Sequence, residues 1–254
     1  MTTERGPVRI LVVQHEDDAG PGLVGERLQA AGCAVTVVAP AGVLREAAEV
    51  PGSADGFDGV VVLGGTPGPA DDSSAPWLPQ VRQLIADCLD RDVPLLGICL
   101  GAQLLAHVAG GAVLPLPAGP EIGIAPLWLS DAAFSDALMS GLEPPLQAVQ
   151  WHELEVAELP PGARLLCRGE ECAHQAFRVG RSAWGLQFHM EVLADSVVAW
   201  ARSGADELAG AGIRGADLVA DVQAAERGLR SMWAPVADRW IGVCIARRDS
   251  GADA

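Results

Sequence analysis

The first hundred residues alternate between short apolar segments and longer segments in which apolar residues recur at helical spacing. The apolar segments are residues 8–13, 34–39, 60–63 and 93–98. Such runs, bounded by proline, glycine or charged residues, are typical of strands that are covered on both faces. The helices predicted between them are residues 21–31, 43–48 and 77–89. Strand and helix in alternation indicate an α/β fold with a mostly parallel open sheet flanked by helices.

The pattern changes after residue 111. Short β candidates separated by turn residues now follow one another, which predicts an antiparallel β addition to the sheet. They are residues 112–116, 123–129, 146–151, 164–167, 175–179 and 183–188. From about residue 195 the chain is predicted to be helical, and Pro235 is expected to interrupt the last helix. We expect one domain over residues 1–194 and a C-terminal helical extension, 195–254, packed on it.

The composition indicates a folded and strongly acidic chain. Half of the 254 residues are hydrophobic, which is enough for a core, and the formal net charge is −16. A surface of this sign repels phosphate backbones, so nucleic acid is excluded as a partner on electrostatic grounds. No apolar run is long enough to span a bilayer, and the N-terminus has no signal-peptide core. We therefore expect a cytoplasmic protein without a membrane partner.

One of the six cysteines stands in a setting that favours chemistry. None belongs to a C-x-x-C pair or has the spacing of a zinc site, so we expect reduced thiols and no metal. Cys99, however, follows an apolar strand and precedes a helical stripe, with Gly97 and Gly101 on either side. This spacing predicts a tight strand-to-helix turn like the G-x-S-x-G elbow, with the sulfur at the carboxyl edge of the sheet. A buried packing cysteine is the alternative.

A cysteine nucleophile needs a base, and the base needs a group that orients it. His189 lies two residues before Glu191. In an extended segment these two side chains face the same side and can form a hydrogen bond. A solvated strand end would give the same pattern, but the presence of Cys99 in the same chain favours the catalytic interpretation.

The other four histidines are weaker candidates. His15 follows the first strand in an acidic loop and could contact a ligand, and His152 stands at a strand end, where it could act on the substrate side. His107 lies in the helix after Cys99, which favours a structural role. His174 precedes a strand and has no evident partner in the sequence.

Residues 97–103, Gly-Ile-Cys-Leu-Gly-Ala-Gln, and residues 185–192, Gly-Leu-Gln-Phe-His-Met-Glu-Val, together resemble the class I (triad) glutamine amidotransferases. Stand-alone members similar to the amidotransferase domain of GMP synthase are the closer resemblance. Supporting similarities lie at residues 16–22, 60–65, 150–152 and 159–163. The resemblance covers about residues 8–194 and implies a flavodoxin-like sheet.

The resemblance also implies a role for each matching residue. Cys99 would be the nucleophile, His189 the base and then the acid, and Glu191 the orienting carboxylate. The backbone amides of Gly65 and Leu100 would form the oxyanion hole. The implied substrate-binding residues are Gly64, Gln103 and His152. Two departures from the family pattern are Met190, in place of a usual proline, and the variant loop 66–72.

The implied reaction is hydrolysis of the γ-glutamyl amide bond of glutamine or of a γ-glutamyl conjugate. It would pass through a cysteine-linked thioester, release glutamate and ammonia or an amine, and need no cofactor. The partners would be a small γ-glutamyl substrate and, where ammonia is handed on, a separate synthase, because no phosphate-cradling glycine loop follows residue 194.

Two alternatives stay open. One is a non-catalytic regulatory or ligand-binding protein that retains the fold, and the other is a glutaminase that works only in the presence of a synthase. A cysteine hydrolase of the other α/β family with a cysteine elbow, in which histidine directly follows the nucleophile, is disfavoured because Leu100 occupies that position.

Overall fold

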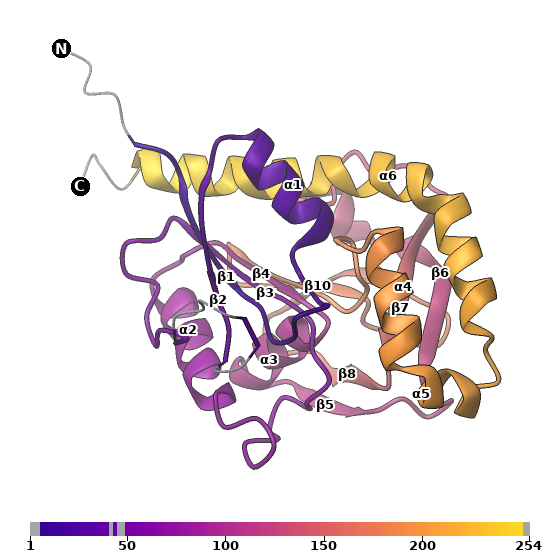
Figure 1. The fold of residues 1–254 in the computed structure, drawn as a ribbon. Helices are drawn as coiled ribbons and strands as arrows, with labels where there is room; N and C mark the ends of the chain where they lie inside the picture. Colours follow the sequence, from indigo (N-terminus) through magenta and orange to yellow (C-terminus); the bar gives the residue numbers. More distant parts are fainter. Residues whose placement is uncertain (1–5, 41–42, 45–48, 251–254) are drawn as a thin grey trace.

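The computed structural model describes residues 6–40, 43–44 and 49–250. Its main sheet has nine strands in the order β2-β1-β3-β4-β11-β10-β9-β6-β7. The first five strands in this order pair in parallel. The pairings from β11 to β7 are antiparallel. This arrangement, flanked by helices, confirms the predicted α/β class with a mostly parallel half and an antiparallel addition (Figure 1).

The central strands of the parallel half are buried on both faces, whereas the edge strand β2 is mostly exposed. Its strands are β2 (Ala34–Val38), β1 (Arg9–Val13), β3 (Gly59–Val62), β4 (Leu95–Ile98) and β11 (Ala183–Leu186). Every residue of β3, β4 and β11 is buried. Strands covered on both sides have no polar face, which is why these segments are continuous apolar runs in the sequence.

Two pairs of helices cover the two faces of this half. α1 (Gly22–Ala30) and α6 (Gly215–Ser250) share a hydrophobic cluster with Ile10 and Val12 of β1. α2 (Leu78–Asp90) and α3 (Leu100–Val108) share a second cluster with residues of β1 that point the other way, such as Leu11. A Cβ atom at Gly59 of β3 would lie only 2.5 Å from Sγ of Cys244 in α6. The C-terminal helix is therefore packed into the core of the sheet.

The antiparallel half continues the sheet beyond β11. Its strands are β10 (Ala176–Val179), β9 (Arg164–Arg168), β6 (Glu121–Leu129) and β7 (Leu146–His152), with the 3₁₀ helix η1 (Asp131–Ser135) after β6. β5 (Ala112–Pro115) pairs with β8 (Leu154–Glu158) in a separate two-stranded ribbon. The sequence did not predict β8 because only Val156 is buried in it, so its hydrophobic signal is weak. The strand forms because its backbone pairs with β5, and a hydrophobic pattern does not reveal such pairing.

The helices α4 (Ala194–Ser203) and α5 (Ala205–Gly210) precede α6. The prediction that Pro235 interrupts the last helix is wrong, because α6 runs without a break from residue 215 to 250. Pro235 cannot donate a hydrogen bond to the Ser231 carbonyl, but both residues are exposed, so water can satisfy that oxygen. Buried Trp233 and Val236 hold the helix on either side of the proline.

The helix predicted over residues 43–48 lies mostly outside the described residues, since only 43 and 44 are described. None of the helices in the described part of the chain combines the length and the apolar character needed to cross a membrane.

Candidate active site

The segments that follow four of the parallel strands meet at the carboxyl edge of the sheet. They follow β1, β3, β4 and β11, and residues from each of them line a cavity of about 810 Å³. Residues of α4 and α5 line the same cavity from the C-terminal part of the chain. In open α/β sheets this edge is where ligands bind. The sheet topology therefore places the cavity where a substrate site is expected.

Cys99 connects β4 to α3 in a strained backbone conformation and lines the cavity. Its φ of 51° and ψ of −107° lie in a region that residues other than glycine rarely adopt. The turn is so tight that there is no room for a side chain at either flanking glycine. A Cβ atom at Gly97 would lie 2.5 Å from the Gly101 carbonyl oxygen, and one at Gly101 would lie 2.0 Å from the Val62 carbonyl oxygen. The predicted strand-to-helix elbow is confirmed.

Gly64 and Gly65 follow β3 and lie against the elbow. A Cβ atom at Gly64 would be 3.0 Å from Cε1 of His189 and 3.4 Å from Cβ of Cys99, so both side chains pack on this glycine. The amide of Gly65 has no acceptor among the described residues. The amide of Leu100 is at the first position of α3, where helical N–H groups lack an intrahelical acceptor. Free donors beside a reactive sulfur are what an oxyanion hole requires.

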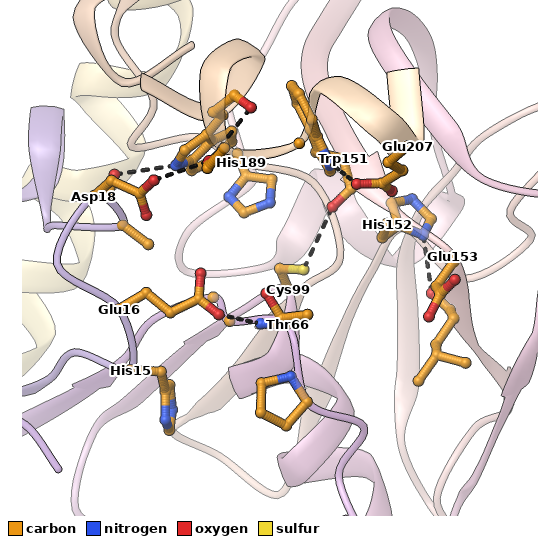
Figure 2. Close-up of a pocket in the computed structure, with 18 of the residues that line it drawn as sticks. His15, Glu16, Asp18, Thr66, Cys99, Trp151, His152, Glu153, His189 and Glu207 are labelled. Atoms are coloured by element: carbon orange, nitrogen blue, oxygen red, sulfur yellow. Dashed lines mark hydrogen bonds between the residues drawn. The ribbon is translucent and has the colours of Figure 1, made fainter. Parts of the chain in front are cut away.

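His189 forms a buried pair with Glu191. Nδ1 of His189 is 2.8 Å from Oε1 of Glu191, and each side chain is 4% exposed. Burial lowers the pKa of His189, but the negative charges of Glu191 and Cys99 outweigh it and raise the pKa well above its ordinary value. Since Nδ1 faces the carboxylate, Nε2 is the nitrogen left for proton transfer on the cavity side. Figure 2 shows the His189 ring above the Cys99 side chain.

The His189–Glu191 pair lies just beyond β11, which ends at residue 186 and not at 188 as predicted. Backbone hydrogen bonds hold the pair in place of strand pairing. The His189 N–H donates to the Val149 carbonyl oxygen at 2.9 Å, and the Leu23 N–H donates to the Glu191 carbonyl oxygen at 2.8 Å. The predicted contact between His189 and Glu191 is therefore present, although the backbone there bends and is not an extended strand.

A tryptophan that the sequence analysis did not single out, Trp200, covers His189, and Trp151 supports it. Trp200 of α4 packs edge-on against the His189 ring, with 4.8 Å between the ring centroids. Trp151 of β7 packs edge-on against Trp200 at 5.7 Å. Trp200 Nε1 donates to the Asp18 carbonyl oxygen at 3.0 Å, which ties α4 to the loop after β1. No sequence signal marked Trp200, because it lies in the segment expected to be only an extension.

The predicted substrate-binding residues Gln103 and His152 lie at the cavity but differ in how their side chains are used. Gln103 Nε2 donates to the Leu154 carbonyl oxygen at 3.2 Å and to Gln187 Oε1 at 3.3 Å, while its Oε1 has no partner in the described part of the chain. Both ring nitrogens of His152 are occupied, by the Leu154 carbonyl oxygen and by Glu121 Oε2. The His152 side chain therefore shapes the turn, and its backbone is what remains for a ligand.

The other histidines have protein partners or lie away from the cavity. His15 packs under Gly65, and Trp77 Nε1 donates to its Nδ1 at 3.0 Å. Burial lowers the pKa of His15 to about 4, so the ring is neutral near pH 7. His107 is exposed on α3, and His174 Nδ1 donates to the Val156 carbonyl oxygen at 2.7 Å. Neither of these two lines the cavity.

The remaining cysteines are not part of the cavity. All six thiols are free. Burial raises the pKa of Cys88, Cys167 and Cys172 to about 12, which keeps these thiols protonated and unreactive. In the described ranges, no group of three or more His, Cys, Asp or Glu side chains is arranged to hold a metal ion.

Comparisons with known proteins identify the family of the chain. The family model described as "Glutamine amidotransferase class-I" matches residues 22–196. A glutamine amidotransferase-like protein of Salmonella typhimurium, YfeJ, is 32% identical over 165 residues, which are 64% of this chain and 68% of that protein. One chain of the glutamine-hydrolysing GMP synthase of Ignicoccus hospitalis, named as a subunit of that enzyme, is 39% identical over 100 residues. That match covers 39% of this chain and 51% of the other, so the likeness extends over only about half of its length.

A solved structure extends the likeness to nearly the whole chain. The crystal structure of a glutamine amidotransferase of Thermotoga maritima has a TM-score of 0.81 and 28% sequence identity to this chain. The superposition covers 93% of this chain and 99% of the other. It therefore includes much of the C-terminal helical region, which the family model does not reach.

Proposed function

Because the chain belongs to the class-I glutamine amidotransferase family, we propose that it hydrolyses γ-glutamyl amide bonds through a thioester on Cys99. The observation that carries this proposal is the strained Cys99 elbow packed, together with the His189–Glu191 pair, against Gly64. A nucleophile, a base and an orienting carboxylate in contact are the parts that amide cleavage by a cysteine enzyme needs.

In the first step the Cys99 thiolate attacks the γ-carbonyl carbon. The carbonyl oxygen becomes an oxyanion, which the amides of Gly65 and Leu100 stabilise. Each such donor contributes about 3 kcal/mol to the transition state in comparable acyl-transfer sites. Imidazolium is the form that the raised pKa of His189 favours, and it protonates the departing nitrogen as the C–N bond breaks. The product is a γ-glutamyl thioester and a free amine or ammonia.

In the second step water hydrolyses the thioester. His189 takes a proton from the water, which attacks the thioester carbonyl, and the C–S bond breaks. Glutamate leaves, and the thiolate and imidazolium are restored. Glu191 stabilises the imidazolium and keeps Nε2 directed at the reacting atoms. Gln103, with its free Oε1 at the cavity, would bind the glutamyl part of the substrate.

A second candidate is that the chain works as the glutaminase component of a larger assembly. This is favoured by the 39% identity to the GMP synthase chain of Ignicoccus hospitalis, whose name as a subunit implies a separate synthase component. In that case glutamine would be the substrate and its ammonia would pass to the partner. The two candidates share the chemistry at Cys99 and differ in the leaving group, which is an amine or ammonia.

The test is to incubate the purified protein with glutamine and with a panel of γ-glutamyl amides and to measure glutamate. We expect release by the wild type and a loss of about a thousandfold or more in the Cys99→Ser variant, as when a catalytic nucleophile is removed. Cys33→Ser is the matched control, because Cys33 is partly exposed and does not line the cavity.

The outcomes separate the candidates. Ammonia from glutamine alone indicates a free glutaminase, and release only from conjugates indicates a hydrolase. Activity that develops only on addition of a synthase indicates a component of a larger assembly. Unchanged rates in Cys99→Ser would remove Cys99 as the nucleophile and contradict the proposal.

A further inference from the structure

The cavity around Cys99 has a strong imbalance of charge. Its lining includes carboxylates from three segments of the chain, and none of the described residues that line it is a lysine or arginine. The carboxylates are Glu16, Asp17, Asp18, Glu153, Asp206 and Glu207. Figure 2 shows Glu16, Asp18, Glu153 and Glu207 placed around the space in front of Cys99. A ligand in this cavity therefore meets negative charge on several sides.

No arginine that the structure describes neutralises these carboxylates. Elsewhere acidic residues pair with arginines, as Asp72 does with Arg82 and Asp238 with Arg27. None of the cavity carboxylates has an ion-pair partner within the ranges that the structure describes. The cavity therefore keeps uncompensated charge that a cationic ligand would balance.

The contacts that these carboxylates do make are with neutral donors. Glu16 Oε1 accepts the Thr66 N–H at 2.6 Å, and Glu207 Oε2 accepts Trp151 Nε1–H at 2.9 Å. Each of these bonds uses one oxygen and holds the side chain at the cavity. The other oxygen of each carboxylate remains for a ligand.

Two further features of the same cavity point to a ligand that carries N–H groups. The side chain of Gln103 is buried, with the residue 3% exposed, yet its Oε1 has no partner in the described part of the chain and its residue lines the cavity. Trp151 and Trp200 also line the cavity, and indole rings attract ammonium groups. The Gln103 acceptor suits the N–H groups of the glutamyl end, while the aromatic rings and free carboxylates match the chemistry of a cationic amine.

The volume allows more than glutamine. Pockets of about 300–1,000 Å³ hold drug-sized ligands, and this one is about 810 Å³. Asp206 and Glu207 belong to α5, so the wall of the cavity that α5 forms carries negative charge. This wall lies beyond residues 22–196, which the family model matches.

We propose that the amine released at this site is a di- or polyamine, whose far ammonium group lies among the cavity carboxylates while its γ-glutamyl end reaches Cys99. The inference rests on the proposed function. The reaction is balanced as before: water is consumed, the γ-glutamyl C–N bond breaks, and glutamate and the protonated amine are released. An amine with a carboxylate at its far end would be repelled by the same wall.

The test compares γ-glutamyl amides that differ mainly in the charge at the far end of the amine. They are the conjugates of 1,4-diaminobutane, of n-pentylamine and of 4-aminobutyrate. We expect kcat/KM to be about tenfold higher for the cationic conjugate than for the neutral one, and lowest for the anionic one, since several weak ion pairs add. Added salt should reduce the difference.

Variants identify the source of the preference. Glu207→Gln keeps an acceptor for Trp151, and combined with Asp206→Asn it removes two charges from the α5 wall. In the double variant, the ratio of kcat/KM for the cationic conjugate to that for the neutral conjugate should fall about fivefold or more. Glu170→Gln is the matched control, because Glu170 is exposed in the loop before β10 and does not line the cavity.

Each result decides between definite alternatives. Hydrolysis of the neutral or anionic conjugate at equal or higher kcat/KM would overturn the inference and leave the proposed function standing. Two other results would overturn it in the same way: hydrolysis of glutamine but of none of the conjugates, or a preference for the cationic conjugate that is unchanged in the double variant. Absence of hydrolysis with every amide, glutamine included, would instead mean that the proposed function itself has failed.

Discussion

The backbone at Cys99 and the residues that surround it determine the chemistry at the smallest scale. A positive φ on a residue with a side chain costs about 1–3 kcal/mol and persists only where the surroundings enforce it. Here the enforcement comes from the contacts of Gly97 and Gly101 with neighbouring backbone. Such a strained position at a sheet edge is typical of a functional site, and Cys99 lines the cavity.

Glu16 is predicted to hold the loop that provides the Gly65 amide. Its Oε1 accepts the Thr66 N–H at 2.6 Å, directly after two glycines, whose backbone can adopt more conformations than that of other residues. We expect Glu16→Ala to lower kcat by about tenfold, the effect of losing one charged hydrogen bond, with a smaller change in KM. Glu16→Gln retains a carbonyl oxygen and should restore most of kcat.

Hydrogen exchange of the Thr66 amide checks the same prediction without activity. The amide should exchange faster in Glu16→Ala than in Glu16→Gln. Asp17→Ala is the comparison, since Asp17 lines the cavity and has no hydrogen bond to the loop. Equal rates of exchange in all three variants would show that Glu16 does not fix the loop.

His15 is predicted to make stability depend on pH. Its pKa is about 4 in the folded chain and near 6.5 when unfolded. The unfolded chain therefore takes up a proton first as the pH falls, and the free energy of unfolding decreases between pH 6.5 and 4. The contribution lost by pH 5 is about 2 kcal/mol.

His15→Asn should remove this dependence, because Oδ1 can still accept Trp77 Nε1–H. Urea denaturation at pH 7 and pH 5 measures the change. We expect the variant to gain stability relative to the wild type as the pH falls. An equal loss of stability in both proteins as the pH falls would contradict the prediction.

The raised pKa of His189 affects stability with the opposite sign. Its stabilising effect is present below pH 6.5 and is lost as the pH rises through the pKa of the folded chain. It is common to both proteins.

The spacing of residues close together in the sequence predicted part of the site but not the residues that come from distant segments. The elbow and the His189–Glu191 contact follow from residues close in sequence, whose geometry the chain itself determines. Trp200 and Glu207 could not be found in this way, because they reach the cavity only through the packing of α4 and α5. Their roles depend on contacts between segments far apart in the chain.

At the scale of elements, the best predicted strands are those that are buried on both faces. β3 and β4 are apolar throughout, so their pattern is unambiguous. β8 was missed because its stability comes from pairing with β5 and not from its own burial. The error at Pro235 has a similar origin, since packing of α6 on the sheet outweighs the lost hydrogen bond.

The contact between α3 and β3 is predicted to depend on glycine. A Cβ at Gly101 would lie 2.0 Å from the Val62 carbonyl oxygen, so Gly101→Ala should destabilise the fold by about 3 kcal/mol or more through overpacking. Gly228→Ala is the matched control, because Gly228 is exposed in α6 with nothing within 4 Å of a Cβ atom. It should stabilise by about 0.5–1 kcal/mol. Similar free energies of unfolding for the two variants would contradict this explanation.

At the scale of the whole molecule, the C-terminal helices are integral to both core and cavity. α6 shares the hydrophobic cluster of α1 and β1, while α4 and α5 supply one wall of the cavity. The division into residues 1–194 and an extension, drawn from the sequence pattern, remains a proposal about chain organisation. The packing argues that the two parts fold together.

Removal of α6 is therefore predicted to abolish cooperative folding. A chain ending at residue 214 would expose the face of β1 that carries Ile10 and Val12. We expect its far-UV circular dichroism to change gradually with urea, where the full chain shows a single transition. A fragment with the transition midpoint of the full chain would show that the first part is an independent domain.

The central claim is that a γ-glutamyl group becomes covalently attached to Cys99. The most direct measurement is to mix the protein with a γ-glutamyl amide, quench with acid within the first turnover, and map the adduct by mass spectrometry. The account predicts one added γ-glutamyl group, on the peptide that contains Cys99, and none in Cys99→Ser. Turnover without an adduct, or an adduct on another residue, would contradict it.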